Sequence, residues 1–195
     1  MKLYLSVIGV CMALIAAFNI VFETVSWYCV IISVVWCTVL QFVFDGAMAI
    51  MIRLMNDKYF GVDNPHFKVS ARSRKLYASL GVRKWKDKVW ELGGLGGFSK
   101  ARLEDPKNPE YIEKFIIECN KGVVTHRLCY IAGFFAIFTV SGIIKLTVAL
   151  PVAIVNLFLN ILPTVVLRYN TPALMRVLSR MKKQKENISE SIKHS

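Results

Sequence analysis

Cysteine pairs and nucleotide-binding loops are missing from this sequence. It has five cysteines but no Cys-x-x-Cys pair, so neither a zinc site nor a disulfide framework is indicated. The glycine-rich stretch "LGGLGGFSK", residues 92–100, lacks the GK[ST] ending of a phosphate-binding loop and follows no expected strand, so a flexible turn is the simpler interpretation. The five thiols are expected to be reduced and packed, with a catalytic thiol at Cys119 as the alternative.

Acidic residues are scarce, and the basic residues are unevenly distributed. The chain has 25 Lys and Arg against 13 Asp and Glu, a net charge of +12. Residues 53–127 carry 16 basic against 9 acidic side chains, and residues 168–195 carry 7 against 2. The positive-inside rule therefore predicts that both segments, and both termini, are cytoplasmic. Topology and anionic lipid headgroups explain the basic excess, and no nucleic-acid-binding motif supports nucleic acid as a partner.

Charged residues are nearly absent from four long apolar stretches. These stretches are residues 3–22, 25–52, 128–144 and 146–167, and only Asp45 places a charge inside one of them. A helix needs about 20 mostly apolar residues to cross a bilayer. We therefore predict an all-α, polytopic integral membrane protein with four transmembrane helices in two hairpins. Because the second stretch follows the first almost directly, an uncleaved anchor is expected rather than a signal peptide.

The same pattern divides the chain into four segments. Residues 1–52 form an N-terminal transmembrane hairpin, 53–127 a basic cytoplasmic or interfacial segment, 128–167 a C-terminal transmembrane hairpin, and 168–195 a basic cytoplasmic tail. Residues 73–90 are expected to form amphipathic helices that break near Gly81. Their face at the headgroup layer is expected to contain Tyr77, Leu80, Trp85, Val89 and Trp90.

A longer helix is expected to begin at about residue 108 and to enter the third span without a break. Asn108 is a good N-cap, and Pro109 suits the first helical position. His126 lies where this helix becomes apolar, and an imidazole there can act as a general base near neutral pH. A histidine that is hydrogen-bonded at the membrane interface is the simpler alternative. Glu118 lies eight residues earlier, about 12 Å along a straight helix, so the two residues do not form a dyad on that helix.

Polar residues also occur in the second and fourth spans and at the end of the fourth. Asn156 and Asn160 share one helical face, where they either join helices or contact a substrate. Asp45 needs a buried partner, and Arg168 is one candidate. Arg168 opens the stretch "RYNTPALMR" and offers a fixed fork for phosphate or carboxylate. A positive-inside anchor with an interfacial tyrosine is the alternative for this stretch. Pro163 is expected to kink the fourth helix.

Several motifs occur in a fixed order along the chain: "VRKWKDK", "GGFSKARLEDPKNPEYIEKFIIE", His126 and "NILPTVVLRYNTPAL". Together they resemble the glycosyl-4,4'-diaponeurosporenoate acyltransferase family of small bacterial membrane proteins. The resemblance implies a location in the bacterial cell membrane and the last step of staphyloxanthin-type carotenoid synthesis. In that step a fatty acyl chain is esterified to the 6-hydroxyl of the glucose on a glycosyl C30 carotenoid acid. The resemblance implies acyl-CoA or acyl carrier protein as the donor co-substrate, with no metal or other cofactor.

The resemblance also implies roles for individual residues. His126 and Glu118 match the family's histidine and the glutamate before it, so they are the candidate catalytic residues. His126 would be the general base, and Glu118 would bind or orient the sugar. The candidate substrate-binding residues match the other motifs and are Trp85, Lys86, Asn160, Arg168, Tyr169 and Asn170. Arg168 and Lys86 would hold the donor's phosphates or the developing oxyanion.

The chain departs from the family pattern at four positions. Val123 stands where the family has glutamate, Arg127 where it has tryptophan, Leu167 where it has glutamine, and Thr171 where it has arginine. In addition, residues 124–140 contain no aspartate, so the classical HxxxxD acyltransferase motif is missing at His126. Two alternatives therefore stay open. One is a lipid-modifying transferase of other specificity, and the other is a non-catalytic membrane protein that binds anionic lipid or a partner.

Overall fold

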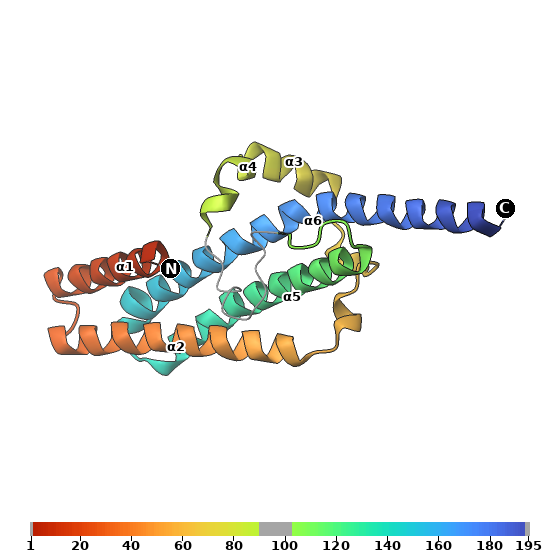
Figure 1. The fold of residues 1–195 in the computed structure, drawn as a ribbon. Helices are drawn as coiled ribbons and strands as arrows, with labels where there is room; N and C mark the ends of the chain where they lie inside the picture. Colours follow the sequence, from red (N-terminus) through yellow and green to blue (C-terminus); the bar gives the residue numbers. More distant parts are fainter. Residues whose placement is uncertain (1, 90–102, 194–195) are drawn as a thin grey trace. The chain divides into compact units, whose positions relative to one another are not determined.

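The computed structural model describes residues 2–89 and 103–193, and every regular element within them is helical (Figure 1). The long helices are α1 (Lys2–Val21), α2 (Trp27–Leu54), α5 (Pro109–Gly133) and α6 (Leu150–Lys193). The shorter elements are η1 (Asp57–Phe60), η2 (Pro65–Phe67), α3 (Ala71–Ser79), α4 (Val82–Trp85), η3 (Lys86–Lys88), η5 (Phe134–Thr139) and η6 (Lys145–Ala149). The glycine-rich stretch 92–100 and Trp90 lie outside the described residues.

Four helical stretches in the described part of the chain are long and apolar enough to cross a membrane. They are Tyr4–Val21, Trp27–Leu54, Pro109–Thr139 and Lys145–Asn187. This confirms the predicted all-helical class with four candidate spans and suggests a multi-pass membrane protein. The last two stretches exceed the predicted ones, because α5 and α6 continue into polar sequence. The side of the membrane on which the termini lie stays a prediction.

The chain divides into two compact units. Unit 1 comprises Met1–Leu54 and Val124–Thr164, and unit 2 comprises Met55–Val123 and Val165–Ser195. Helix α5 begins in unit 2 and ends in unit 1, whereas α6 begins in unit 1 and ends in unit 2. Each unit has an apolar core of its own.

Unit 1 has a small core and a large apolar exterior. Helix α1 packs along α2 (Figure 1), and the core residues are Ala16, Val30, Val34, Cys37, Val148, Ala149 and Val152. Only 6% of the first span is buried within the structure. An apolar exterior of this kind is unfavourable in water and favourable in hydrocarbon, where helices satisfy their own backbone hydrogen bonds.

A buried asparagine stabilises the turn between α1 and α2. The Asn19 side chain is fully buried, and its Nδ2 donates to Ile15 O at 2.8 Å and to Thr147 O at 2.9 Å. Its Oδ1 accepts from the Thr24 hydroxyl at 2.8 Å. Every polar group of the amide is therefore used to connect the turn to the helices around it.

Unit 2 is built around the first half of α5 and the second half of α6. Its core residues are Val62, Ile112, Phe115, Ile116, Cys119, Val123, Leu167, Leu174 and Leu178. The predicted N-cap of α5 is confirmed, since Asn108 Oδ1 accepts from Glu110 N at 3.0 Å and Tyr111 N at 3.3 Å. The predicted break is confirmed as well, because Gly81 separates α3 from α4 with a left-handed φ of 60°.

The predicted interfacial face is wrong at Tyr77, which is buried with 8% of its surface exposed. The prediction treated aromatic residues next to lysines as headgroup ligands. In the structure the Tyr77 hydroxyl has a protein partner, Arg168, whose position 91 residues away the local sequence pattern does not reveal.

Candidate functional site

His126 and Asn160 meet in unit 1, where α5 and α6 bring them together from 34 residues apart. His126 Nδ1 lies 2.8 Å from Asn160 Oδ1. The Asn160 Nδ2 group donates to the carbonyl of Asn156 at 3.1 Å and to its Oδ1 at 3.0 Å. These two acceptors fix the orientation of the Asn160 amide, so its oxygen faces the imidazole. His126 Nδ1 must then be the donor, and the neutral ring keeps a lone pair on Nε2.

Asp45 extends this polar cluster on α2. Its Oδ2 lies 3.5 Å from Asn160 Nδ2, so the same amide links the carboxylate to the imidazole. The Cys129 thiol donates to the Asp45 carbonyl at 3.9 Å, and Asn156 Nδ2 donates to the Cys129 carbonyl at 3.3 Å. The sequence suggested a basic partner for Asp45, whereas the structure places an asparagine amide next to its carboxylate.

The candidate catalytic residue Glu118 belongs to an ion-pair group in unit 2. Lys121 Nζ lies 3.4 Å from Glu118 Oε1 and 2.5 Å from Asp57 Oδ1, and only 12% of the Lys121 side chain is exposed. One lysine therefore balances two carboxylates. The sequence could have indicated the pairing of Glu118 with Lys121, because the two residues are three apart on one helix. Nothing in the sequence indicated Asp57 as the second partner of Lys121.

Arg168 is held in place by two contacts within unit 2. Its Nε donates to the Tyr77 hydroxyl at 3.3 Å, and its Nη2 donates to the Lys68 carbonyl at 3.4 Å. Tyr169 and Asn170 are half-buried on the same helix. Helix α6 runs through this stretch without ending, so "RYNTPALMR" is not a helix terminus.

The two remaining predicted substrate-binding residues contact their own segment. Trp85 Nε1 donates to the Leu80 carbonyl at 3.0 Å. Lys86 Nζ lies 3.4 Å from the Asp87 carboxylate, and 28% of the lysine side chain is exposed. These contacts fix the local shape of the segment from α3 to η3 and leave the binding role of both residues as a prediction.

A pocket in unit 2 is lined in part by Lys68, whose carbonyl accepts a hydrogen bond from Arg168. Its volume is about 310 Å³, and it is lined by Val62, Phe67, Lys68, Val69, Ile116, Asn120, Thr171, Pro172 and Met175. This volume lies at the lower end of the range for small-molecule sites, and the mainly apolar lining with a few polar groups is typical of them.

Three of the four departures from the family pattern lie in the interior of unit 2. Val123 and Leu167 are each 1% exposed and belong to the same core cluster. At both positions the side chain that is present is apolar and belongs to this buried core. Thr171 is 6% exposed, lines the pocket and donates to the Leu167 carbonyl at 2.9 Å. A threonine leaves room in this pocket that an arginine would occupy.

None of the five cysteines, all of which lie within the described residues, forms a disulfide, and Cys119 is 2% exposed within the core of unit 2. Within residues 2–89 and 103–193, no group of three or more His, Cys, Asp and Glu side chains is placed to hold a metal ion.

Comparison with known proteins gives one match. The model of the family described as glycosyl-4,4'-diaponeurosporenoate acyltransferase matches residues 56–180. No curated protein and no solved structure gives a significant match. The matched range includes His126, Asn160 and Arg168, but it begins after α2. Because it covers more than half of the chain, the protein belongs to the glycosyl-4,4'-diaponeurosporenoate acyltransferase family, whose name implies an acyltransferase.

Proposed function

We propose that this protein esterifies a hydroxyl of a glycosylated lipid with a fatty acyl chain. Within the family the acceptor is the 6-hydroxyl of the glucose on a glycosyl C30 carotenoid acid, and acyl-CoA or acyl carrier protein is the donor. The observation that best supports this proposal is the 2.8 Å contact between His126 Nδ1 and Asn160 Oδ1. That contact leaves Nε2 as the basic atom, which is the requirement for a general base.

The proposed reaction needs one proton carrier. As the acceptor oxygen attacks the thioester carbonyl, its proton passes to His126 Nε2 and a C–O bond forms. The tetrahedral intermediate then collapses, the C–S bond breaks, and the proton returns to the leaving thiolate. During this step the imidazole is positively charged, so its Nδ1–H bond to the Asn160 oxygen becomes charge-assisted and stronger. A positioned base of this kind contributes about 10²- to 10⁴-fold to the rate.

We assign the acyl donor to the pocket in unit 2. The apolar lining of Val62, Phe67, Ile116 and Met175 suits an alkyl chain. The Arg168 guanidinium is fixed by Tyr77 and the Lys68 carbonyl, and a fixed guanidinium fork suits the donor's phosphates. Lys86, Trp85, Tyr169 and Asn170 stay proposed as further contacts for the substrates.

Glu118 stays proposed as a ligand of sugar hydroxyls. Its carboxylate shares Lys121 with Asp57, and the shared lysine orients it. An ionised carboxylate accepts hydrogen bonds from hydroxyl groups at either oxygen.

The acceptor is tested with the purified protein in lipid nanodiscs, labelled acyl-CoA, and a set of candidate lipids. The set contains a glucosylated C30 carotenoid acid, the same carotenoid acid without glucose, and a glucosyl diacylglycerol. We expect a labelled ester only with glucosylated acceptors. Acylation of the glucosyl diacylglycerol alone would establish a transferase of other specificity. If no lipid is acylated and the protein only binds anionic vesicles, it is non-catalytic and the proposal is wrong.

A further inference from the structure

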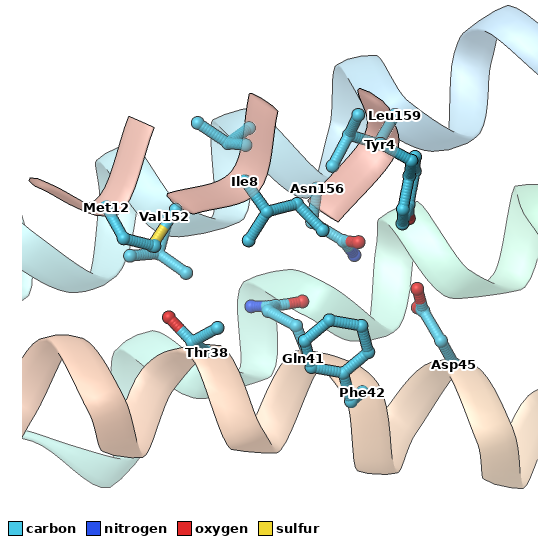
Figure 2. Close-up of a pocket in the computed structure, with 11 residues that line it drawn as sticks. Tyr4, Ile8, Met12, Thr38, Gln41, Phe42, Asp45, Val152, Asn156 and Leu159 are labelled. Carbon is cyan, nitrogen blue, oxygen red and sulfur yellow. The ribbon is translucent and has the colours of Figure 1, made fainter. Parts of the chain in front are cut away.

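A second, smaller pocket lies among α1, α2 and α6 of unit 1, and Figure 2 shows its lining. It is lined by Tyr4, Ile8, Met12, Thr38, Gln41, Phe42, Asp45, Val152, Val155, Asn156 and Leu159. The volume of this pocket is about 30 Å³. This space holds one or two waters, or a polar group that belongs to a larger molecule. Most of the lining residues precede residue 56, where the family match begins, and most of the others are apolar. The family match therefore gives no role to this pocket.

Two buried acceptor oxygens in this pocket have no hydrogen-bond partner among the described residues. They are Gln41 Oε1 and Asp45 Oδ1. Gln41 is 6% exposed, and it lies one helical turn before Asp45 on the same face of α2. Figure 2 shows both side chains directed from α2 toward Asn156 and Tyr4. Native proteins rarely leave such atoms unpaired, so two of them on one pocket require an explanation.

The surrounding contacts fix which atom of Gln41 is left without a partner. Its Nε2 donates to the Gly133 carbonyl at 2.8 Å, so Oε1 is the end that remains available. Gly133 permits this close approach, because a Cβ there would lie 2.5 Å from Gln41 Oε1 and 2.6 Å from Asn156 Nδ2. A side chain at residue 133 would displace one or both amides, whereas glycine lets them come together without that shift.

Two neighbouring donors in the pocket are already engaged. The Thr38 hydroxyl donates to the Val34 carbonyl at 2.7 Å, and Asn156 Nδ2 donates to the Cys129 carbonyl at 3.3 Å. Gln41 Oε1 is an acceptor, and Asp45 Oδ1 is one whenever the carboxyl group is ionised, so donors from a ligand would pair both oxygens. A pair of adjacent hydroxyl groups supplies two donors, one for each of these oxygens.

We propose that this pocket is a subsite for adjacent hydroxyls of a sugar headgroup, bound through Gln41 Oε1 and Asp45 Oδ1. The proposal rests on the proposed function, because it places two adjacent hydroxyls of the acceptor's sugar in this subsite. The same Asp45 carboxylate lies 3.5 Å from Asn160 Nδ2, and Asn160 Oδ1 holds His126. The subsite is thus connected to the proposed base through a single amide, and the N-terminal hairpin acquires a role in acceptor recognition.

The test compares two lipids in nanodiscs and needs no turnover. Wild-type protein is prepared with glucosyl diacylglycerol or with diacylglycerol at the same mole fraction, and its thermal unfolding midpoint is measured. We expect the glucosyl lipid to raise the midpoint of the wild type, because a ligand that binds only the native state stabilises it. Gln41→Met and Asp45→Asn are expected to lose this difference. Trp36→Phe is expected to keep the difference in midpoint. Trp36 lies elsewhere on α2, and this variant removes only its hydrogen bond to Thr139.

A kinetic measurement separates this subsite from the proposed reaction. For Gln41→Met we expect the KM for the acceptor to rise about tenfold, with the KM for the donor unchanged. Equal midpoints with the two lipids in the wild type would mean that the pocket holds only water, and this would overturn the subsite. An unchanged acceptor KM in Gln41→Met would also overturn it while leaving the acyl transfer intact. A sugar-dependent midpoint without any acyl transfer would uphold the subsite and contradict the proposed function.

Discussion

Replacing Asn160 by leucine tests the polar cluster at its centre. The substitution preserves approximate size and removes every polar contact of the side chain. His126 Nδ1 loses its acceptor at 2.8 Å, and the carbonyl and Oδ1 of Asn156 lose a donor at 3.1 and 3.0 Å. The Asp45 carboxylate loses its neighbour at 3.5 Å. The imidazole is then no longer held in the form that leaves Nε2 basic.

The size of the effect follows from the charge on the imidazole in the transition state. A hydrogen bond to a charged group contributes about 1.5–3 kcal/mol, and about 1.4 kcal/mol corresponds to a tenfold change in rate. We therefore expect Asn160→Leu to lower kcat by about 10- to 150-fold. Because the donor is assigned to the other unit, its KM is expected to stay unchanged.

The assay is acyl transfer from labelled acyl-CoA in nanodiscs at saturating concentrations of both substrates. Thr164→Val is the matched control, since Thr164 lies one turn later on α6 and its hydroxyl donates only to the Asn160 carbonyl, at 2.9 Å. The control is expected to retain kcat within about twofold, because a backbone carbonyl in a helix keeps other partners. A folded Asn160→Leu protein with the kcat of the wild type would refute the assignment of His126 orientation to Asn160.

Three further substitutions test unit 2. Arg168→Lys loses the guanidinium fork and its contact with Tyr77, so the donor KM is expected to rise about tenfold in the acyl-transfer assay; an unchanged KM would contradict the donor assignment. Thr171→Arg places a long side chain at the 310 Å³ pocket, so the longest acyl chains should be transferred least well, and an unaltered chain-length profile would count against this pocket. Lys121→Met leaves two carboxylates without their shared cation, so it should destabilise the protein by about 1–3 kcal/mol in thermal unfolding. The control Lys182→Met removes a half-exposed ion pair and should destabilise the protein by less than about 1 kcal/mol. Equal losses in the two lysine variants would show that burial of Lys121 is unimportant.

Local features of the fold were predictable from the sequence because their causes are local. The four apolar runs are long enough to identify candidate spans by length and composition alone. The N-cap at Asn108 and the break at Gly81 depend on side-chain and backbone preferences of single residues. Helix α6 was underestimated, since the expected end at Leu167 relied on a loss of hydrophobicity. A helix continues through such a polar sequence when one of its faces stays apolar. On α6 that face includes Leu174 and Leu178, which lie in the core of unit 2.

The candidate site was predictable only in part, because its contacts join distant segments. His126 and Asn160 were identified singly, but their 2.8 Å contact spans 34 residues. Asp45 was noted as an intramembrane charge, and the sequence gave no means to select Asn160, 115 residues away, as its neighbour. Gln41 was not predicted. The signal that could have indicated it was its i,i+4 spacing from Asp45, since two polar residues on one face of an apolar helix usually face protein, water or ligand.

The most direct test of the central claim is the rate of acyl transfer by His126→Ala compared with wild type. The measurement uses purified protein in nanodiscs, labelled acyl-CoA and a glucosylated C30 carotenoid acid, with the neighbouring Thr125→Val as the matched control. We expect His126→Ala to lose about 10²- to 10⁴-fold in kcat, which is the contribution of a general base, while Thr125→Val keeps the wild-type rate. A folded His126→Ala protein that forms the labelled ester at the wild-type rate would contradict the account.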